Sequence, residues 1–454
     1  MMTKGAIGNL INRYKAVLKK CHLINVFGSL AVVSLLVGGA TSNAYAMDQD
    51  LYEQIKAITT FGDAPDFPAN VGDTKRLYFG GKLAEAGQSV DMESSSVTLS
   101  SGTLTGEMNA GGLAYGTGAN SHVANASITM SGGTLTQMAD HPDGDIYSPI
   151  RGGGAAFNGG TSVVDNAVIN ITGGQFDTAG GVTDIMGGGV ADSESSSLTK
   201  NATINIGNTV SLNSNVAIYG GGDNANVGNA TININTDSFY DGRDYTIHGG
   251  GIASEDGAVA HVDTTEIHLT GNNRDESEYG EYGYIFGGGE AKNGGLSTVG
   301  TSNIIIESGT LYDTMITGGG DVGNHESKNA RTYVENSNIK ITGGTITNSD
   351  IYGGGSVWGD SSNSSHVGMA NITVRGGTIN GNETFHYDGI YGGGHVYAGL
   401  ADVDSASINI NGGEINNTFI YGGGYAENGE SNVGKSSITV NDGNIASEIV
   451  GGGL

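Results

Sequence analysis

Short apolar alternations recur along most of the chain, and they predict β-strands. Within the stretch Asn338–Gly355, Ile339 and Ile341 flank a polar residue, and Gly343-Gly344 follows. Alternation with a period of two places one row of side chains inside and the other row in water. A second short apolar element then ends at a triple glycine. The stretch therefore predicts two strands joined by a glycine turn.

Versions of this stretch recur from about residue 78 to the end of the chain. Ten triple glycines have an isoleucine two positions upstream, and they start 29 to 39 residues apart, near 33 on average. Self-similarity at such a period marks a repeat architecture. Each repeat offers too few inward aliphatic residues for a core of its own, so the copies must stack.

We therefore predict an all-β fold, a right-handed parallel β-helix (solenoid) of about eleven coils of about 33 residues. The right-handed sense is expected from the crossover rule for parallel strands. A β-propeller needs four strands in each blade and normally has four to eight blades. Immunoglobulin-like domains need about 100 residues each. Both alternatives fit these short repeats poorly.

The residue between each isoleucine and its triple glycine forms a second pattern. If the isoleucine points inward, this neighbour points outward. Five of these neighbours are aromatic, with His248 and Thr317 between them: Tyr219, Phe286, Tyr352, Tyr391 and Tyr421. We predict that they form a surface ladder. Two interpretations stay open, ring stacking that stabilises the coils or an exposed stripe that contacts a glycan or a protein.

The charge balance excludes several classes of partner. Residues 1–46 hold five basic residues and no acidic one, so the rest of the chain carries 47 acidic against 14 basic residues, a net charge of −33. Such a body repels nucleic acid and anionic lipid headgroups, so we expect no nucleic-acid partner. The single cysteine, Cys21, lies in the leader. We therefore expect no disulfide in the exported chain.

No group of catalytic or metal-ligating residues is evident in the sequence. The histidines are scattered among loops and outward strand positions, and no two of them show zinc-ligand spacing with a suitable third. The glycine triplets lack the Lys-Ser/Thr of a phosphate-binding loop. We expect no catalytic residue, no metal site, no cofactor and no enzyme activity. Weak Ca²⁺ binding by loops such as Asp223–Asn226 stays open.

Residues 1–46 have the organisation of an export signal. A basic region ends at Lys20, an apolar run follows from Ile24 to Val37, and small residues precede the predicted cleavage site. The apolar run is too short for a stable membrane span. We predict cleavage between Ala46 and Met47.

The domain organisation follows from these segments. We predict a signal peptide at residues 1–46, an N-terminal cap or linker at residues 47–76, and the repeat β-helix at residues 77–454. Apolar residues at helical spacing predict a short helix from Asp48 to Thr60. Solenoids need caps, and this helix is expected to cover the first open edge of the repeats.

The leader is also unusually long. Its segment Asn12–Leu30 resembles the extended signal peptides of Gram-negative autotransporter (type V secretion) proteins. The resemblance implies export through the inner membrane and the periplasm to the cell surface or the extracellular space. It also implies an outer-membrane translocator. Nothing in the sequence resembles the C-terminal barrel of that family, so we expect a truncated reading frame or a translocator that this chain does not encode.

By analogy with that family, the chain is expected to be an adhesin-like passenger, a rigid β-helical rod. It would contact a glycan or protein on host or neighbouring-cell surfaces, although architecture alone does not determine function. Two alternatives stay open. One is a carbohydrate-active β-helix enzyme, a polysaccharide lyase or hydrolase, and the other is a purely structural surface spacer.

Overall fold

The computed structural model describes most of the chain beyond the leader. The described ranges are 49–61, 75–136, 150–177, 182–207, 210–211, 215–235, 245–271, 283–323, 327–381 and 388–453. Residues Ala44–Leu454 form one unit, and the fold lies within it. The predicted signal peptide and its cleavage between Ala46 and Met47 lie outside the described residues, so both stay predictions.

Each coil has one long strand and a return side made of shorter strands. In one coil, β26 (Arg331–Ile341) runs to the Gly343-Gly344 turn, and β27 (Thr345–Thr347) and β28 (Asp350–Tyr352) return. β29 (Ser356–Val357) follows the triple glycine and leads to the next long strand. The second glycine of the turn has a φ of 82°, which glycine adopts without the steric cost of a side chain.

The other strands repeat these four positions. The long strands are β26, β4 (Ser89–Leu99), β7 (Asn120–Thr136), β10 (Thr161–Asp177), β13 (Ser196–Ile206), β16 (Asn226–Ile234), β19 (Val259–Leu269), β22 (Leu296–Ile306), β30 (Ser364–Val374), β34 (Leu400–Asn416) and β37 (Glu430–Ala446). The strands before the glycines are β28, β2 (Lys75–Phe79), β5 (Thr103–Asn109), β8 (Ile150–Arg151), β11 (Val182–Met186), β15 (Asn215–Tyr219), β17 (Tyr245–His248), β20 (Gly283–Phe286), β24 (Thr314–Thr317), β32 (Gly389–Tyr391), β35 (Phe419–Tyr421) and β38 (Ile449–Val450). The strands after the glycines are β29, β3 (Leu83–Glu85), β6 (Leu113–Tyr115), β9 (Ala155–Phe157), β12 (Val190–Ala191), β18 (Ile252–Ala253), β21 (Glu290–Ala291), β25 (Asp321–Val322), β33 (His395–Val396) and β36 (Tyr425–Ala426). Short strands after the first turn are β27, β14 (Val210–Ser211), β23 (Thr310–Tyr312) and β31 (Thr378–Asn380).

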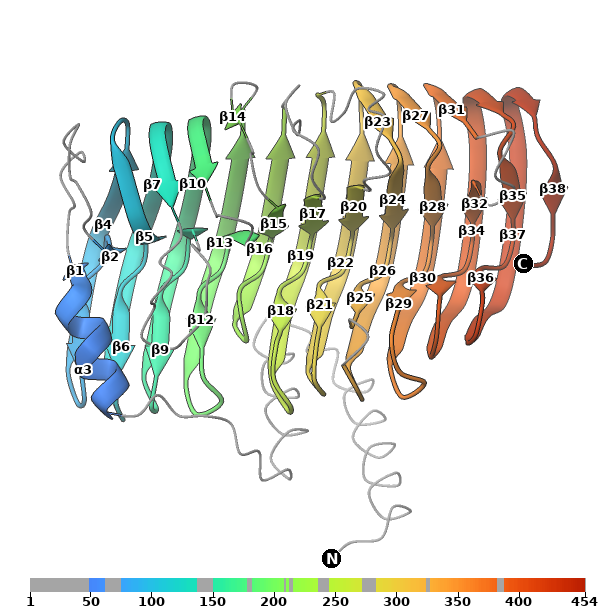
Figure 1. The fold of residues 1–454 in the computed structure, drawn as a ribbon. Helices are drawn as coiled ribbons and strands as arrows, with labels where there is room; N and C mark the ends of the chain where they lie inside the picture. The colour runs from blue at the N-terminus through green and yellow to red at the C-terminus, as the bar shows by residue number, and fades with distance from the viewer. Residues whose placement is uncertain are drawn as a thin grey trace, which may run out of the picture. The chain divides into compact units, whose positions relative to one another are not determined.

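The strand pairings among the described residues are parallel, and they link one coil to the next. Ile339 of β26, for example, is the register partner of Ile304 in β22 and of Ile372 in β30. One sheet of 28 strands holds the long strands and most returning strands, and the strands after the glycines form sheets of four and six. The strands of successive coils lie side by side in chain order (Figure 1). The eleven long strands and their parallel pairing confirm the predicted β-helix of about eleven coils, and its right-handed sense stays a prediction.

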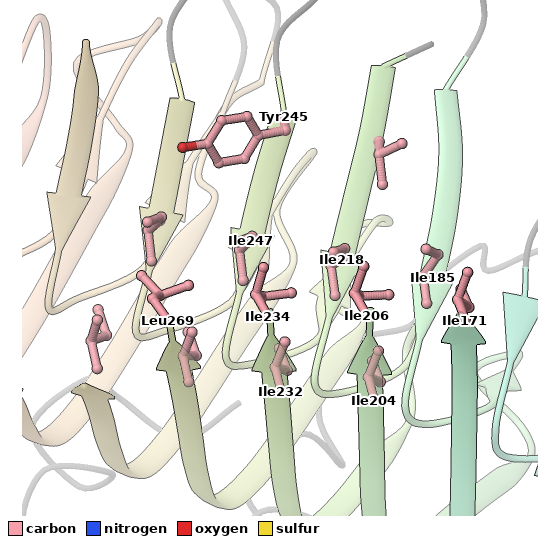
Figure 2. Close-up of a cluster of buried hydrophobic side chains, with 14 of the residues drawn as sticks. Ile171, Ile185, Ile204, Ile206, Ile218, Ile232, Ile234, Tyr245, Ile247 and Leu269 are labelled. Carbon is pink, nitrogen blue, oxygen red and sulfur yellow. The ribbon is translucent and has the colours of Figure 1, made fainter. Parts of the chain in front are cut away.

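The interior is built from columns of aliphatic side chains that run from coil to coil. Ile339, Ile341, Ile346 and Ile351 of one coil are all buried, with exposed fractions of 0–1%. Figure 2 shows three such columns, made by Ile204 and Ile232, by Ile206, Ile234 and Leu269, and by Ile185, Ile218 and Ile247. Each buried isoleucine contributes about 1.5–3 kcal/mol. The thin layers are therefore stabilised by stacking.

The two ends of the described repeat differ. At the beginning, α3 (Gln49–Ile58) confirms the predicted short helix, and β1 (Thr59–Phe61) follows it directly. β1, and not the helix, pairs with β2 and continues the sheet at this end. In the last coil, Val440 and Ile449 are 45% and 46% exposed, although their column positions are buried in earlier coils. Among the described residues, no helix has the length and apolar character needed to cross a membrane.

Candidate functional site

The triple glycines lie where the backbone of one coil comes very close to the next coil. A Cβ added to Gly353 would lie 2.6 Å from the Gly392 carbonyl oxygen and 2.9 Å from the Ala370 Cβ. One added to Gly354 would lie 2.6 Å from the Gly394 amide nitrogen. Because well-packed interiors leave no room for such overlap, a triplet with a further coil stacked on it needs glycine at these positions.

Outside each triplet, side chains from the two flanking strands converge in a region that we call the glycine corner. Column one is the residue before the triplet, column two the first residue after it, and column three the third residue after it. In one coil these residues are Tyr352, Ser356 and Trp358. The Tyr219 hydroxyl of column one donates to Glu290 Oε2 of column two at 2.6 Å. Columns one and two therefore face each other across the corner.

The predicted aromatic ladder lies in column one, and its rings stack on their neighbours. Centroid distances are 4.8 Å for Tyr219–His248 and His248–Phe286, 4.7 Å for Tyr352–Tyr391 and 5.1 Å for Tyr391–Tyr421. Thr317 separates the two runs. Each stacked pair contributes about 0.5–1.5 kcal/mol beyond burial. Stacking within this column is thus present in two runs.

These rings do not form an exposed stripe. The five predicted aromatic residues have exposed fractions of 0–8%. Neighbouring rings cover their faces, and column two packs beside them, as in the contact of 5.4 Å between the Tyr352 and His395 rings. The prediction that the ladder lies on the surface is therefore wrong, because neighbouring rings and the side chains of column two cover the rings of column one.

Column two carries a cluster of carboxylates that the sequence analysis did not identify. Lys292 Nζ lies 2.8 Å from Glu290 Oε1. Burial opposes ionisation of Glu290, but Lys292 and His248, with the hydrogen bonds from Lys292 and Tyr219, outweigh burial and lower its pKa. Burial, followed by the Glu290 charge, raises the pKa of Asp321 to about 8. The two neighbouring carboxyl groups therefore differ in charge at neutral pH.

Glu290 and Asp321 are register partners on adjacent coils. The buried Oδ1 atom of Asp321 has no hydrogen-bond partner among the described residues. Asp184 belongs to the same environment, and burial raises its pKa to about 6. Groups whose surroundings shift their pKa values in opposite directions can act as an acid and a base.

The histidines of the corner are neutral at physiological pH. Burial is the main cause that lowers the pKa of His248 to about 4, and it has the same effect on His395. Asp223, in one of the loops considered for Ca²⁺, accepts a hydrogen bond from Ser254 Oγ at 2.9 Å. In the part of the chain that the structure describes, no three acidic, histidine or cysteine side chains are placed to hold a metal ion.

Column three presents large aromatic residues at both ends of the described coils. It holds Glu85, Tyr115 and Phe157 in the first coils, and Trp358, Tyr397 and Glu427 in the last ones. Tyr397 is 36% exposed. The predicted ladder concerned only the residue before each triplet, so column three was not predicted from the sequence. Aligning the third residue after each triplet in the sequence would have identified column three.

Comparisons of the chain with protein-family models, with curated proteins and with solved structures found no match.

Proposed function

We propose that the chain is an adhesin-like autotransporter passenger that contacts a glycan or protein on host or neighbouring cells. The observation that carries the proposal is column three, where Trp358 and Tyr397 stack on the outside of a rigid scaffold with centroids 5.7 Å apart. Tryptophan and tyrosine are the side chains that most often contribute strongly to protein interfaces.

The export part of the proposal rests on the leader and on its resemblance to extended autotransporter signal peptides. The passenger would reach the cell surface or the extracellular space, and a separate outer-membrane translocator is expected as its partner. The net charge of −33 beyond residue 46 favours solubility outside the cell and disfavours nucleic acid and anionic lipid as ligands.

The test is to express the full chain with its leader in a Gram-negative cell and to collect the exported product. The product is then applied to a panel of glycans and extracellular-matrix proteins. The proposal expects saturable binding to at least one of them. Saturable binding to none would favour the structural spacer instead.

A second candidate function, glycoside hydrolysis, is favoured by the Glu290–Asp321 pair. Neighbouring strands lie about 4.8 Å apart, near the separation of about 5 Å between the carboxyl groups of retaining glycosidases. Protonated Asp321 would give its proton to the leaving oxygen while Glu290 attacks the anomeric carbon, and water would then release the sugar. Glu290 already binds Lys292 and Tyr219, so the adhesin proposal ranks first.

A polysaccharide cleavage assay separates the two functions. If the chain is a hydrolase, it should release new reducing ends from a polysaccharide. Glu290→Gln and Asp321→Asn should each abolish this release. Binding without cleavage leaves the adhesin proposal in place.

A further inference from the structure

The chain uses column three of its own first coils as a docking surface. The ring of Tyr52, in α3, stacks on Tyr115 with centroids 3.6 Å apart and planes 9° apart. The Tyr52 hydroxyl donates to Glu85 Oε1 at 3.0 Å, and Lys56 forms an ion pair with the same oxygen. Tyr52 and Lys56 are four residues apart, so they lie on one face of the helix.

The last coils repeat the receiving half of this arrangement. Tyr397 N–H donates to the Val357 carbonyl, and Glu427 N–H donates to the Val396 carbonyl. This register makes Trp358, Tyr397 and Glu427 successive members of column three. Both ends thus present two aromatic rings and one glutamate. The order is glutamate first in the early coils and last in the late coils.

The late surface is held in place before any partner arrives. Trp358 Nε1 donates to Ser356 Oγ at 2.7 Å, and the Trp358 ring lies 5.1 Å from the His395 ring. Tyr397 and Glu427 are both exposed. Because the Trp358 and Tyr397 rings are already stacked on each other, docking on them loses little conformational entropy.

The early surface also indicates which chemistry fits the late one. α3 supplies an aromatic ring that stacks on Tyr115 and a lysine that pairs with Glu85. The chain has a large excess of acidic residues, which favours a basic partner. An α-helix that places apolar and charged residues on one face is a common way for a peptide to bind a preformed surface.

We propose that Trp358, Tyr397 and Glu427 form a docking surface for a helical segment of a partner protein that carries an aromatic residue and a lysine four positions later. Because the glutamate comes last in the late coils, the partner helix runs along the coils in the direction opposite to α3. The inference deepens the proposed function and rests on it, since it names the surface through which the passenger would hold a protein partner.

The test uses Trp358, the only tryptophan in the chain, as a local fluorescent reporter. The probe is a synthetic peptide with the sequence of residues 49–61, which contains no tryptophan. We expect saturable change of Trp358 emission when the peptide is added to the exported full chain. Replacing Tyr52 or Lys56 by alanine within the peptide should weaken binding by at least about tenfold.

Variants of the protein test which residues the peptide contacts. Tyr397→Ala and, separately, Glu427→Gln should each weaken peptide binding by about tenfold. Tyr333→Ala is the matched control, because Tyr333 is 40% exposed but lies on a long strand, and it should change nothing. Tyr115→Ala removes the early surface and should leave the Trp358 signal intact. If loss of the Tyr397 ring disturbs the fold, Glu427→Gln still tests the contact, because it changes only the charge of an exposed side chain.

Three outcomes would overturn the inference. The first is that millimolar peptide causes no saturable change in Trp358 emission. The second is that Trp358 emission responds to soluble glycans but not to the peptide, and the third is that it changes with protein concentration alone, which would make a second copy of the chain the occupant. Failure of the proposed function can be told apart from this. The chain would then bind nothing on the panel of glycans and matrix proteins, while the peptide would still change Trp358 emission.

Discussion

Replacing Asp321 by asparagine should remove part of a pH dependence of stability. Burial, followed by the Glu290 charge, raises the pKa of Asp321 from 3.8 to about 8. Between these values the folded chain keeps a proton that the unfolded chain releases. The contribution of this group to the free energy of unfolding is therefore highest below about pH 4, falls as the pH rises, and levels off above about pH 8.

The size of the effect follows from this proton difference. One proton bound only in the folded state changes the free energy of unfolding by about 1.4 kcal/mol per pH unit. Over the whole window of about 4.2 pH units the loss has an upper bound of about 6 kcal/mol. Asp321 retains some solvent exposure, so we expect a narrower window and a total of about 2–3 kcal/mol. Asparagine does not titrate, so the variant gains stability over the native chain as the pH rises.

The measurement is urea unfolding of both chains at pH 5 and pH 8. Trp358 fluorescence reports unfolding of the neighbouring coil, because Ser356 is the register partner of Asp321. The control is Asp360→Asn, since the hydrogen bonds from Ser362 lower the pKa of the exposed Asp360 and place its titration below this range. Equal pH dependence in the native chain and in the Asp321 variant would refute the reasoning.

Three further predictions concern the glycines, the core and the leader. Gly353→Ala should cost about 1–3 kcal/mol through overpacking, whereas Gly451→Ala, at the same triplet position with nothing within 4 Å, should be nearly neutral in thermal melts. Ile351→Ala should cost about 2–5 kcal/mol in urea unfolding, and Ile449→Ala, in the same column but 46% exposed, should cost clearly less. Mass spectrometry of the exported chain should find Met47 as its first residue, and a first residue elsewhere would contradict the predicted cleavage site.

Local alternation was enough to predict which residues turn inward. Ile351 and Tyr352 are neighbours, and a strand sends neighbours to opposite sides. Repetition of that pair every 33 residues or so then predicts columns, since equivalent residues of stacked coils must lie side by side. The stacked rings of Tyr352 and Tyr391 are a consequence of this register. The coil count and the parallel pairing were predictable for the same reason.

Which outward-pointing side chains are buried could not be predicted in this way. The Tyr219 hydroxyl donates a hydrogen bond to Glu290, which lies 71 residues later in the chain and two coils further on. Such a contact depends on how sharply the backbone bends at the glycines and on how the side chains lean along the stack. The opposite pKa shifts of Glu290 and Asp321 depend on the same bend.

The sequence by itself determined the strand pattern, the inward columns and the spacing of the coils, because these depend only on residues close together in the repeat. The tertiary structure alone decided which outward residues are covered, where Tyr52 docks on Tyr115, and which carboxyl groups share one environment. Those features arise from residues brought together across several coils, and the free energy of burial at such places depends on neighbours that no local pattern specifies.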